Sequence, residues 1–406
     1  MTTDTRRAPS TRRLPLVTYV LAAGVFLMGT TEFVVAGILP EIAQDLGITV
    51  GNAGLMITVF AVGMIVGTPT MSILTLKMPR RVTLSLALVV FAVGHVIVAL
   101  TTDFAVILGA RFLTALATGA FWAVAAVVGA KAAGAASASR ALGVVLGGGM
   151  LANVIGVPLG AFAGQSIGWR GPFWILTVLA LMAAIVVYRL VGVEPSSGPI
   201  PSVRAEIASM RDARVWLVLA GCAIVCGSSL AAYSFISPLL TQNTGMGAAA
   251  VPLVLVGYGV GAFIGSNLGG HFGAHRPFTA LFVSAAMTFL VLGALCLLSG
   301  NVLLTVILIF LLGLFGMATN PILIGKAVGY AHRAPTLASA LSTSSFNLGT
   351  AVGSWIAGFA LESALGATGP VLVGTCIAAL YFLPLTILWR KERSPQPSEA
   401  ALSGSA

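Results

Sequence analysis

The sequence predicts an all-α integral membrane protein with twelve transmembrane helices arranged as two pseudo-symmetric six-helix bundles. Hydrophobic residues make up 58% of its 406 residues and charged residues only 8%, whereas roughly a quarter of the residues in a soluble protein are charged. The outer surface must therefore face lipid, where only helices and closed barrels satisfy the backbone hydrogen bonds. The apolar runs are continuous over about 18 residues or more, which indicates helices rather than the alternating strands of a barrel.

Twelve apolar segments are each long enough to cross a bilayer. They are residues 14–39, 51–75, 82–101, 104–130, 141–165, 171–192, 214–240, 250–271, 277–299, 302–329, 336–361 and 369–389. A long polar stretch rich in Pro, Ser and charge separates the sixth from the seventh. We therefore predict five parts, namely a tail 1–13, a first bundle 14–192, a linker 193–213, a second bundle 214–390 and a tail 391–406.

The basic residues are distributed unevenly about these segments. All but two of the 21 Lys and Arg residues lie in the tails, in the linker or at span ends on one side, while the opposite loops hold Arg170 and one span holds Arg111. Basic loops remain in the cytoplasm, so we predict that both termini are cytoplasmic. This placement also accounts for the net charge of +10 without nucleic acid as a partner.

Other classes of function lack their characteristic motifs in this sequence. There is no phosphate-binding loop of the G-x-x-x-x-G-K-[ST] type for ATP, and none of the four histidines groups with a carboxylate as a membrane enzyme would require. Cys222 and Cys226 share a helix face without a histidine or carboxylate beside them, so we expect no metal site. A transporter without a cofactor is the remaining prediction, with a non-transporting membrane receptor as a distant alternative.

The two halves of the chain repeat each other. At an offset of 198 residues, GTTEFVVAGILPEIAQDLG aligns with GSSLAAYSFISPLLTQNTG, and FAVGMIVG aligns with YGVGAFIG. At an offset of 194 residues, NVIGVPLGAFAG aligns with NLGTAVGSWIAG, which pairs Asn153 with Asn347. Repeats of the same sense imply two bundles related by an axis along the membrane normal, with the substrate path between them.

Glycines recur every four residues in two of the predicted spans, a spacing that lets helix backbones approach closely. The spacing fits either static packing or flat faces on which the two bundles rock. The members of interest are Gly156, Gly160, Gly164, Gly261 and Gly265. Pro158 lies within the first series and is expected to kink its span, because proline lacks a backbone donor.

Motifs in the first half resemble those of a known family. The segment LGARFLT around Arg111, the segment GVPLG from Gly156 to Gly160, and GWR followed by Phe173 resemble the major facilitator superfamily, in its twelve-span drug:proton antiporter branch. The segment TEF, followed by GILP, is similar to actinobacterial chloramphenicol exporters and to putative arabinose and purine efflux permeases.

This resemblance implies the major facilitator fold and alternating access in the cytoplasmic membrane of a bacterium. It further implies proton-driven efflux of a small drug-like molecule, with chloramphenicol or a similar antibiotic as the first candidate and a sugar, nucleoside or other metabolite as the alternative. The proton gradient would then be the energy source, with no cofactor. We expect a monomer in the lipid bilayer.

One loop departs from the family pattern. Between the second and third spans, Ser72 and Leu76 stand where the family has Gly and Asp, while Lys77, Arg80 and Arg81 keep the basic positions. A charge latch at this loop would lack its acid, so we do not predict one.

Glu32 is the one carboxylate deep inside a predicted span. It lies eight residues from Pro40, and Arg111 lies eight residues from Asp103, so both are about 12 Å deep. A charge near mid-bilayer usually faces a cavity or a partner. We predict that Glu32 takes up and releases the coupling proton and interacts with Arg111; the alternative is a permanent structural ion pair.

The remaining candidates would line the substrate path. The matched pair Asn153 and Asn347 can donate and accept hydrogen bonds to a polar solute, although interhelical bonding explains them equally well. Drug-sized ligands favour apolar-aromatic pockets with few polar groups, so we add Tyr233, Phe235, Phe121, Trp122, Phe346 and Asn320. His95 lacks an evident partner, and we predict that it serves packing.

Overall fold

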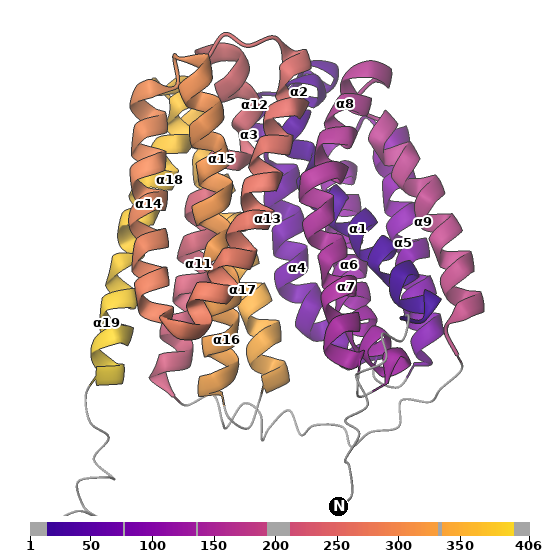
Figure 1. The fold of residues 1–406 in the computed structure, drawn as a ribbon. Coiled ribbons are helices and arrows are strands. Elements are labelled where there is room, and N and C mark those ends of the chain that lie inside the picture. The colour runs from indigo at the N-terminus through magenta and orange to yellow at the C-terminus, as the bar shows by residue number, and fades with distance from the viewer. Residues whose placement is uncertain (1–13, 76–77, 135–136, 193–211, 332–334, 394–406) are drawn as a thin grey trace, which may run out of the picture.

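The computed structural model describes residues 14–75, 78–134, 137–192, 212–331 and 335–393. Within these ranges every regular element is a helix. The long helices run side by side, with those of the first half of the chain on one side and those of the second half on the other (Figure 1). The expectation of an all-α fold is thereby confirmed.

The first half of the chain forms six long helical segments, several of which are interrupted. They are α1 (Leu16–Val34) continued by η1 (Val35–Gly37) and α2 (Leu39–Leu46), α3 (Val50–Ala53) with α4 (Leu55–Leu74), α5 (Arg80–Leu100), α6 (Phe104–Ala133), α7 (Ala138–Leu151) with the π turn η4 (Ala152–Gly156) and α8 (Val157–Ile167), and α9 (Gly171–Leu190).

The second half repeats this arrangement. Its elements are α11 (Ala213–Ser234) with α12 (Ile236–Pro238) and η5 (Leu239–Asn243), η6 (Ala248–Ala250) with α13 (Val251–His275), α14 (Pro277–Leu298), α15 (Val302–Ala318) with α16 (Asn320–Tyr330), α17 (Pro335–Glu362), and η7 (Gly366–Thr368) with α18 (Gly369–Leu380) and α19 (Phe382–Arg393).

Eleven helical segments in the described ranges are long and apolar enough to cross a bilayer. The exception among the twelve expected spans is 336–361, which corresponds to α17. Its 28 residues would extend about 42 Å, so length does not exclude it, but it is rich in Ser and Thr. Because α17 packs against α4 and α11, Ser344 and Ser354 bond to protein, Ser344 to the Ile65 carbonyl and Ser354 to Thr58.

The repeat appears in the backbone as matching helix breaks. The α1 segment leaves the α conformation at Ile38, just before Pro40, and α11 does so at Phe235, just before Pro238. Proline removes a backbone donor and clashes with the preceding turn, which explains a break at the same place in each half. The irregularity expected at Pro158 takes the form of the π turn η4, which ends two residues before it.

The glycine series pack each bundle internally. The first series, Gly156, Gly160 and Gly164, lies against α1 and its continuation, and a Cβ at Gly164 would stand 2.6 Å from the Ile38 side chain. Gly261 and Gly265 lie against the backbone of α15. The structure therefore uses these glycines for close packing of helices within a bundle.

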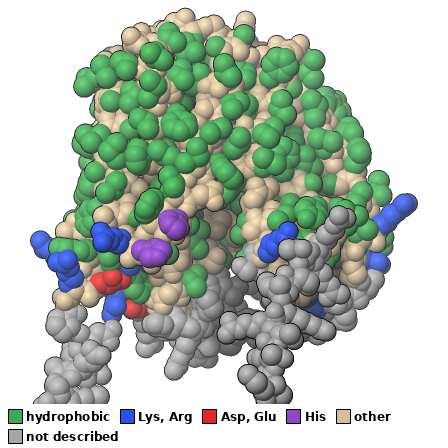
Figure 2. All heavy atoms as spheres, viewed as in Figure 1, with side chains coloured by type: hydrophobic (Ala, Val, Ile, Leu, Met, Phe, Trp, Pro, Cys, Tyr) green, Lys and Arg blue, Asp and Glu red, His purple; other side chains and the backbone are tan. Residues whose placement is uncertain are grey.

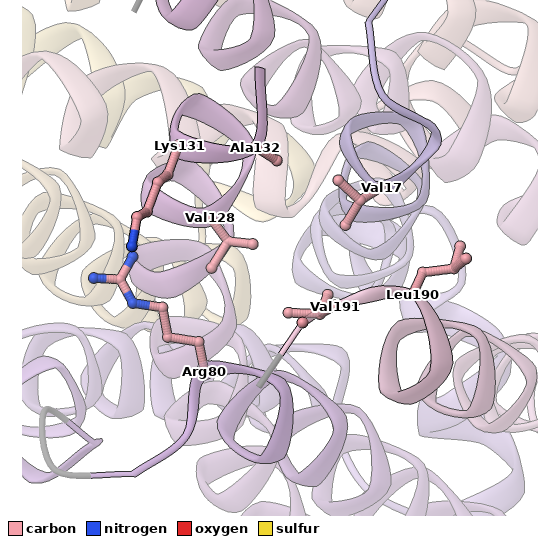
Figure 3. A pocket seen from close by; sticks show the side chains of 8 residues that line it. Val17, Arg80, Val128, Lys131, Ala132, Leu190 and Val191 are labelled. Atoms are coloured by element: carbon pink, nitrogen blue, oxygen red, sulfur yellow. The ribbon is translucent and has the colours of Figure 1, made fainter. Parts of the chain in front are cut away.

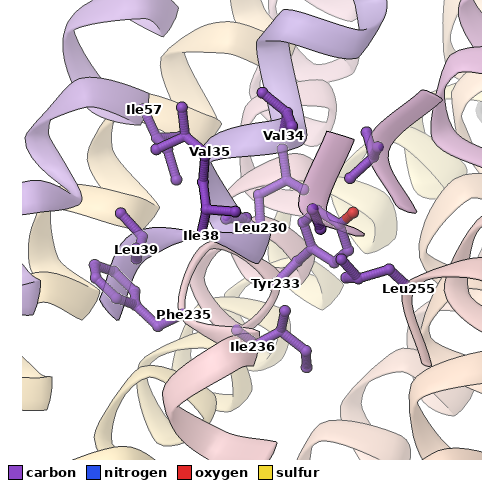
Figure 4. Packing of buried hydrophobic residues seen from close by; sticks show 14 of the residues in the cluster. Val34, Val35, Ile38, Leu39, Ile57, Leu230, Tyr233, Phe235, Ile236 and Leu255 are labelled. Carbon is purple, nitrogen blue, oxygen red and sulfur yellow. The ribbon is translucent and has the colours of Figure 1, made fainter. Parts of the chain in front are cut away.

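The two bundles are joined away from their basic end. Figure 2 shows the Lys and Arg side chains gathered at one end of the molecule, which we call the basic end; the opposite end is the far end. Buried apolar side chains of α1, η1 and α2 pack against those of α11, α12 and α13 (Figure 4). The labelled members are Val34, Val35, Ile38, Leu39, Ile57, Leu230, Tyr233, Phe235, Ile236 and Leu255.

Polar ties between the bundles accompany this apolar cluster. The hydroxyls of Thr58 and Ser354 are 2.9 Å apart, the Gln165 amide donates to the Ala248 carbonyl at 2.9 Å, and the Thr49 hydroxyl donates to Glu362. The far end is thus closed by many apolar contacts and a few hydrogen bonds.

Asp45 ties α2 to the start of α9. Its carboxylate accepts a hydrogen bond from the Trp169 ring nitrogen at 3.0 Å and pairs with Arg170, which lies over the Trp169 ring. The hydrogen bond from Trp169 and that from Arg170 hold the pKa of Asp45 below its ordinary value of 3.8.

Asp45→Asn tests this tie through pH. A lowered pKa means that the carboxylate form stabilises the fold above the unfolded-state pKa, and that this stabilisation is lost as the pH falls through the lowered value. We expect the difference in Tm between the native protein and Asp45→Asn to be constant from about pH 5 to 8 and to shrink below about pH 4. A difference that grew on acidification would contradict the assignment.

Gly265→Val tests the packing of α13 on α15. A Cβ at Gly265 would stand 2.9 Å from the Leu314 Cα, so we expect overpacking to cost about 1–3 kcal/mol and to lower Tm in detergent. Gly257→Val is the matched control, because a Cβ there meets no atom within 4 Å. Equal losses of Tm in the two variants would refute the close contact.

Candidate functional site

Arg111 is the largest fully buried side chain among the described residues. Its Nε donates to the Met56 carbonyl at 3.3 Å, its Nη1 donates to the Thr31 hydroxyl at 2.9 Å, and its guanidinium lies 4.4 Å from the centre of the Phe60 ring. Helix α6 thus holds a cation against α1 and α4. The other terminal nitrogen, Nη2, is buried and has no hydrogen-bond partner among the described residues.

His95 extends this network, and its predicted role in packing alone is wrong. Its Nδ1 lies 2.7 Å from the Phe91 carbonyl, and its Nε2 lies 2.8 Å from the Thr31 hydroxyl. A carbonyl only accepts, so Nδ1 carries the proton, and Nε2 of the neutral ring accepts from Thr31. The hydrogen bonds therefore run in one direction, from Arg111 through Thr31 and His95 to the Phe91 carbonyl.

Glu32 lies beside this network without being part of it. Its carboxylate interacts electrostatically with Arg111 and with Cys226 of α11, but in the described ranges it forms no hydrogen bond or salt bridge. Glu32 is partly accessible, whereas Thr31, His95 and Arg111 are buried. The structure therefore places the acid at the boundary between the bundles, within electrostatic range of Arg111, as a separate group rather than a closed ion pair.

Two tyrosines of the second bundle lie in the apolar cluster that joins the two bundles. Tyr233 and Tyr258 stack with ring centroids 4.1 Å apart, and Phe33 meets Tyr233 edge-on at 6.2 Å. Both tyrosine hydroxyls are buried without a hydrogen-bond partner in the part of the chain that the structure describes. Tyr258 was not among the predicted residues. The repeat at an offset of 198 pairs it with Phe60, whose ring contacts the Arg111 guanidinium.

The two predicted asparagines bond within their own helices. Asn153, in η4, donates to the Gly149 carbonyl at 3.4 Å, and Asn347, in α17, donates to the Thr343 carbonyl at 3.0 Å. Asn153 is partly accessible and Asn347 is buried. Their predicted place on the substrate path remains a prediction.

The remaining path candidates differ in their burial. Tyr233, Phe235 and Phe121 are buried, with Phe235 over Gly54 and Phe121 against Gly24. Trp122, Phe346 and Asn320 are partly accessible. The Trp122 ring nitrogen and the side-chain oxygen of Asn320 are buried without a protein partner in the described ranges. Both can therefore form a hydrogen bond with a solute or with water.

The basic loop residues lie at the basic end of the first bundle. Arg80 lines a cavity of about 150 Å³ together with Lys131, Val17 and Leu190 (Figure 3). Arg81 lies 4.6 Å from the centre of the Tyr188 ring, and Lys77 falls outside the described residues. The side chains that line this cavity include no acid, in keeping with the missing acid of the loop motif.

Metal ligation finds no support in the described ranges, which contain no group of three or more His, Cys, Asp or Glu side chains able to hold an ion. The side chains described above offer an ionisable carboxylate at Glu32, the charge of Arg111, and hydrogen-bonding groups of tyrosine, tryptophan and asparagine without a protein partner in the described ranges.

Thr31→Val tests the network around Arg111. Loss of the hydroxyl leaves Arg111 Nη1 and His95 Nε2 unpaired in a buried site, which we expect to cost about 1–3 kcal/mol and to lower both Tm and transport. Thr31→Ser keeps the hydroxyl and is the matched control. If Thr31→Val and Thr31→Ser behave alike in both measurements, the hydroxyl does not link Arg111 to His95.

Comparisons with known proteins point to one family. The family model described as Major Facilitator Superfamily matches residues 21–337 and 219–405. The chain is 35% identical over 373 residues to a chloramphenicol resistance protein of Streptomyces lividans, covering 91% of this chain and 95% of the relative. It is 30% identical to the inner membrane transport protein YdhP of Escherichia coli (strain K12), covering 92% and 95%.

A third relative carries a different description. The chain is 28% identical to a probable sugar efflux transporter of Mannheimia succiniciproducens, covering 92% of this chain and 93% of the relative. Among solved structures, a bacterial homologue of the human lysosomal transporter Spinster matches with a TM-score of 0.73 and 16% identity, over 94% of this chain and 98% of that one. That likeness shows the fold.

Proposed function

The chain belongs to the Major Facilitator Superfamily, whose members are transporters rather than enzymes, and we propose that it exports a small drug-like molecule in exchange for protons. The observation that carries this proposal is the placement of Glu32, a partly accessible acid between the bundles within electrostatic range of a buried arginine. An ionisable side chain inside the membrane is energetically costly, and such residues generally serve a function such as proton or substrate transport.

The two states of Glu32 would differ in their interactions across the interface. An ionised carboxylate attracts Arg111 and is costly to enclose between apolar helices. A protonated one is neutral and is enclosed more easily, so proton uptake favours the state in which the bundles close around it. Since Arg111 is fixed by Met56, Thr31 and Phe60, a change at Glu32 acts on the interface rather than on the position of the arginine.

The distribution of charge supports an orientation. Basic loops remain on the cytoplasmic side of a bacterial inner membrane, so we infer that the basic end faces the cytoplasm and the far end faces outward. The apolar cluster and polar ties then close the outward passage in the conformation described. A solute would enter from the cytoplasm toward Glu32, Trp122 and Asn320, all partly accessible.

The unpaired groups near the interface favour a neutral, partly apolar solute. Aromatic rings supply apolar contact area, and the hydroxyls of Tyr233 and Tyr258 supply a few hydrogen bonds, the combination that drug-sized ligands prefer. Chloramphenicol or a similar antibiotic is our first candidate, supported by the Streptomyces relative. The sugar efflux relative supports a metabolite as the alternative substrate.

Glu32→Gln is the direct test of proton coupling. Glutamine keeps the shape of the side chain but cannot exchange a proton, so we expect drug export driven by the proton gradient to fall to the background of an exporter-deficient host. Drug accumulation is measured with and without a protonophore, and the protein level in the membrane is checked.

Glu41→Gln is the matched control, because Glu41 lies in α2 beyond the first span. It should keep export sensitive to the protonophore. If Glu32→Gln exported like the native protein, Glu32 would not carry the coupling proton. If the protonophore did not change drug export by the native protein, the proton gradient would not be the energy source. A parallel panel of chloramphenicol and labelled sugars separates the two substrate classes.

A further inference from the structure

The bilayer-facing side of the second bundle carries an apolar groove of about 420 Å³ between α13, α14 and α15. Its floor includes Gly265 and Gly269, which have no side chains, so the neighbouring residues stand up as walls. Leu268, Phe272 and Val283, all exposed, form those walls. The groove exists because small residues on α13 let that helix approach α15 closely.

A second cavity, of about 340 Å³, opens where the groove reaches the basic end. The two cavities share Arg276 and Thr279, and the second is also lined by Trp389 and Arg393 of α19. Along α14, the groove extends from Arg276 to Ser284, about 12 Å at the rise of a helix. Because the two cavities adjoin at these shared residues, we treat them together as one site with an apolar groove and a polar mouth.

The mouth of this site is positively charged. Arg276 is exposed, and Arg393 lies 4.1 Å from the centre of the Trp389 ring; in the described ranges neither arginine pairs with a carboxylate. Glu392, the one acid that lines the mouth, is already engaged by Lys326 at 2.9 Å and by the Tyr330 hydroxyl. Two arginines are thus left to face an anion.

We propose that this site binds an anionic phospholipid, with its phosphate at Arg276 and Arg393 and one acyl chain in the groove. The surface lies in the membrane, and tryptophan beside the mouth is typical of the level of lipid headgroups. Basic pockets between transmembrane helices attract anionic headgroups, whereas a zwitterionic headgroup carries its own cation and gains less. The complementary charge and the adjoining apolar groove together specify this occupant.

The test uses the purified full-length protein, stripped of lipid and analysed by native mass spectrometry. Phosphatidylglycerol and phosphatidylcholine with the same acyl chains are the probes. We expect retention of phosphatidylglycerol in preference to phosphatidylcholine, and binding of phosphatidylglycerol on the order of 10- to 30-fold weaker in Arg276→Gln/Arg393→Gln. The matched control is Arg140→Gln/Arg189→Gln, which removes two exposed arginines from the first bundle and should keep the lipid.

A second variant tests the groove separately from the charge. Thr279→Trp places a large ring at the junction of the two cavities and should weaken the binding of phosphatidylglycerol while both arginines remain. Equal retention of the two lipids, or unchanged binding in Arg276→Gln/Arg393→Gln or in Thr279→Trp, would overturn the proposal. Displacement of the lipid by chloramphenicol would assign the groove to solute instead, and a dimer abolished by Thr279→Trp would assign it to a second copy of the chain.

Discussion

The burial of the Arg111 guanidinium is the constraint on which the first bundle depends. A charge at membrane depth is tolerated when its donors find acceptors, and here the acceptors come from two other helices, the Met56 carbonyl of α4 and the Thr31 hydroxyl of α1. His95 of α5 in turn fixes the direction of that hydroxyl. Helices α1, α4, α5 and α6 must therefore pack in one register, since rotating any of them would leave a buried charge or ring nitrogen unpaired.

The two halves share the same arrangement of helices but differ in where their charged and aromatic side chains lie. In the described ranges, charged side chains of the second bundle other than Lys326 of α16 occur at helix ends, whereas the first bundle holds Glu32 and Arg111 in its interior. The repeat pairs Phe60, which lies under Arg111, with Tyr258, which stacks on Tyr233. The same position of the repeat thus contacts a cation in the first half and takes part in an aromatic pair in the second.

The sequence was sufficient for the fold class, because the length of the hydrophobic segments and the regular rise of a helix determine it. It was not sufficient for contacts that depend on how one helix is rotated against another. His95 and Thr31 are 64 residues apart and meet only after α5 packs on α1. For the same reason the sequence could not indicate that Phe121 and Phe235 are buried; their place on the substrate path stays a prediction. The sequence did predict a span at 336–361, the region of α17, although the Ser and Thr residues of α17 keep it out of the eleven helical segments that are apolar enough to cross a bilayer.

The ties across the far end are mostly uncharged. Thr58 with Ser354 and Gln165 with the Ala248 carbonyl are hydrogen bonds that incoming water can replace as the surfaces separate. A neutral hydrogen bond contributes only about 1 kcal/mol net, and bridging water recovers much of it. Separation of the bundles at this end would therefore be limited by the exposure of the apolar cluster to water rather than by the breaking of buried ion pairs. The rate of opening should then depend more on temperature and on the lipid than on ionic strength.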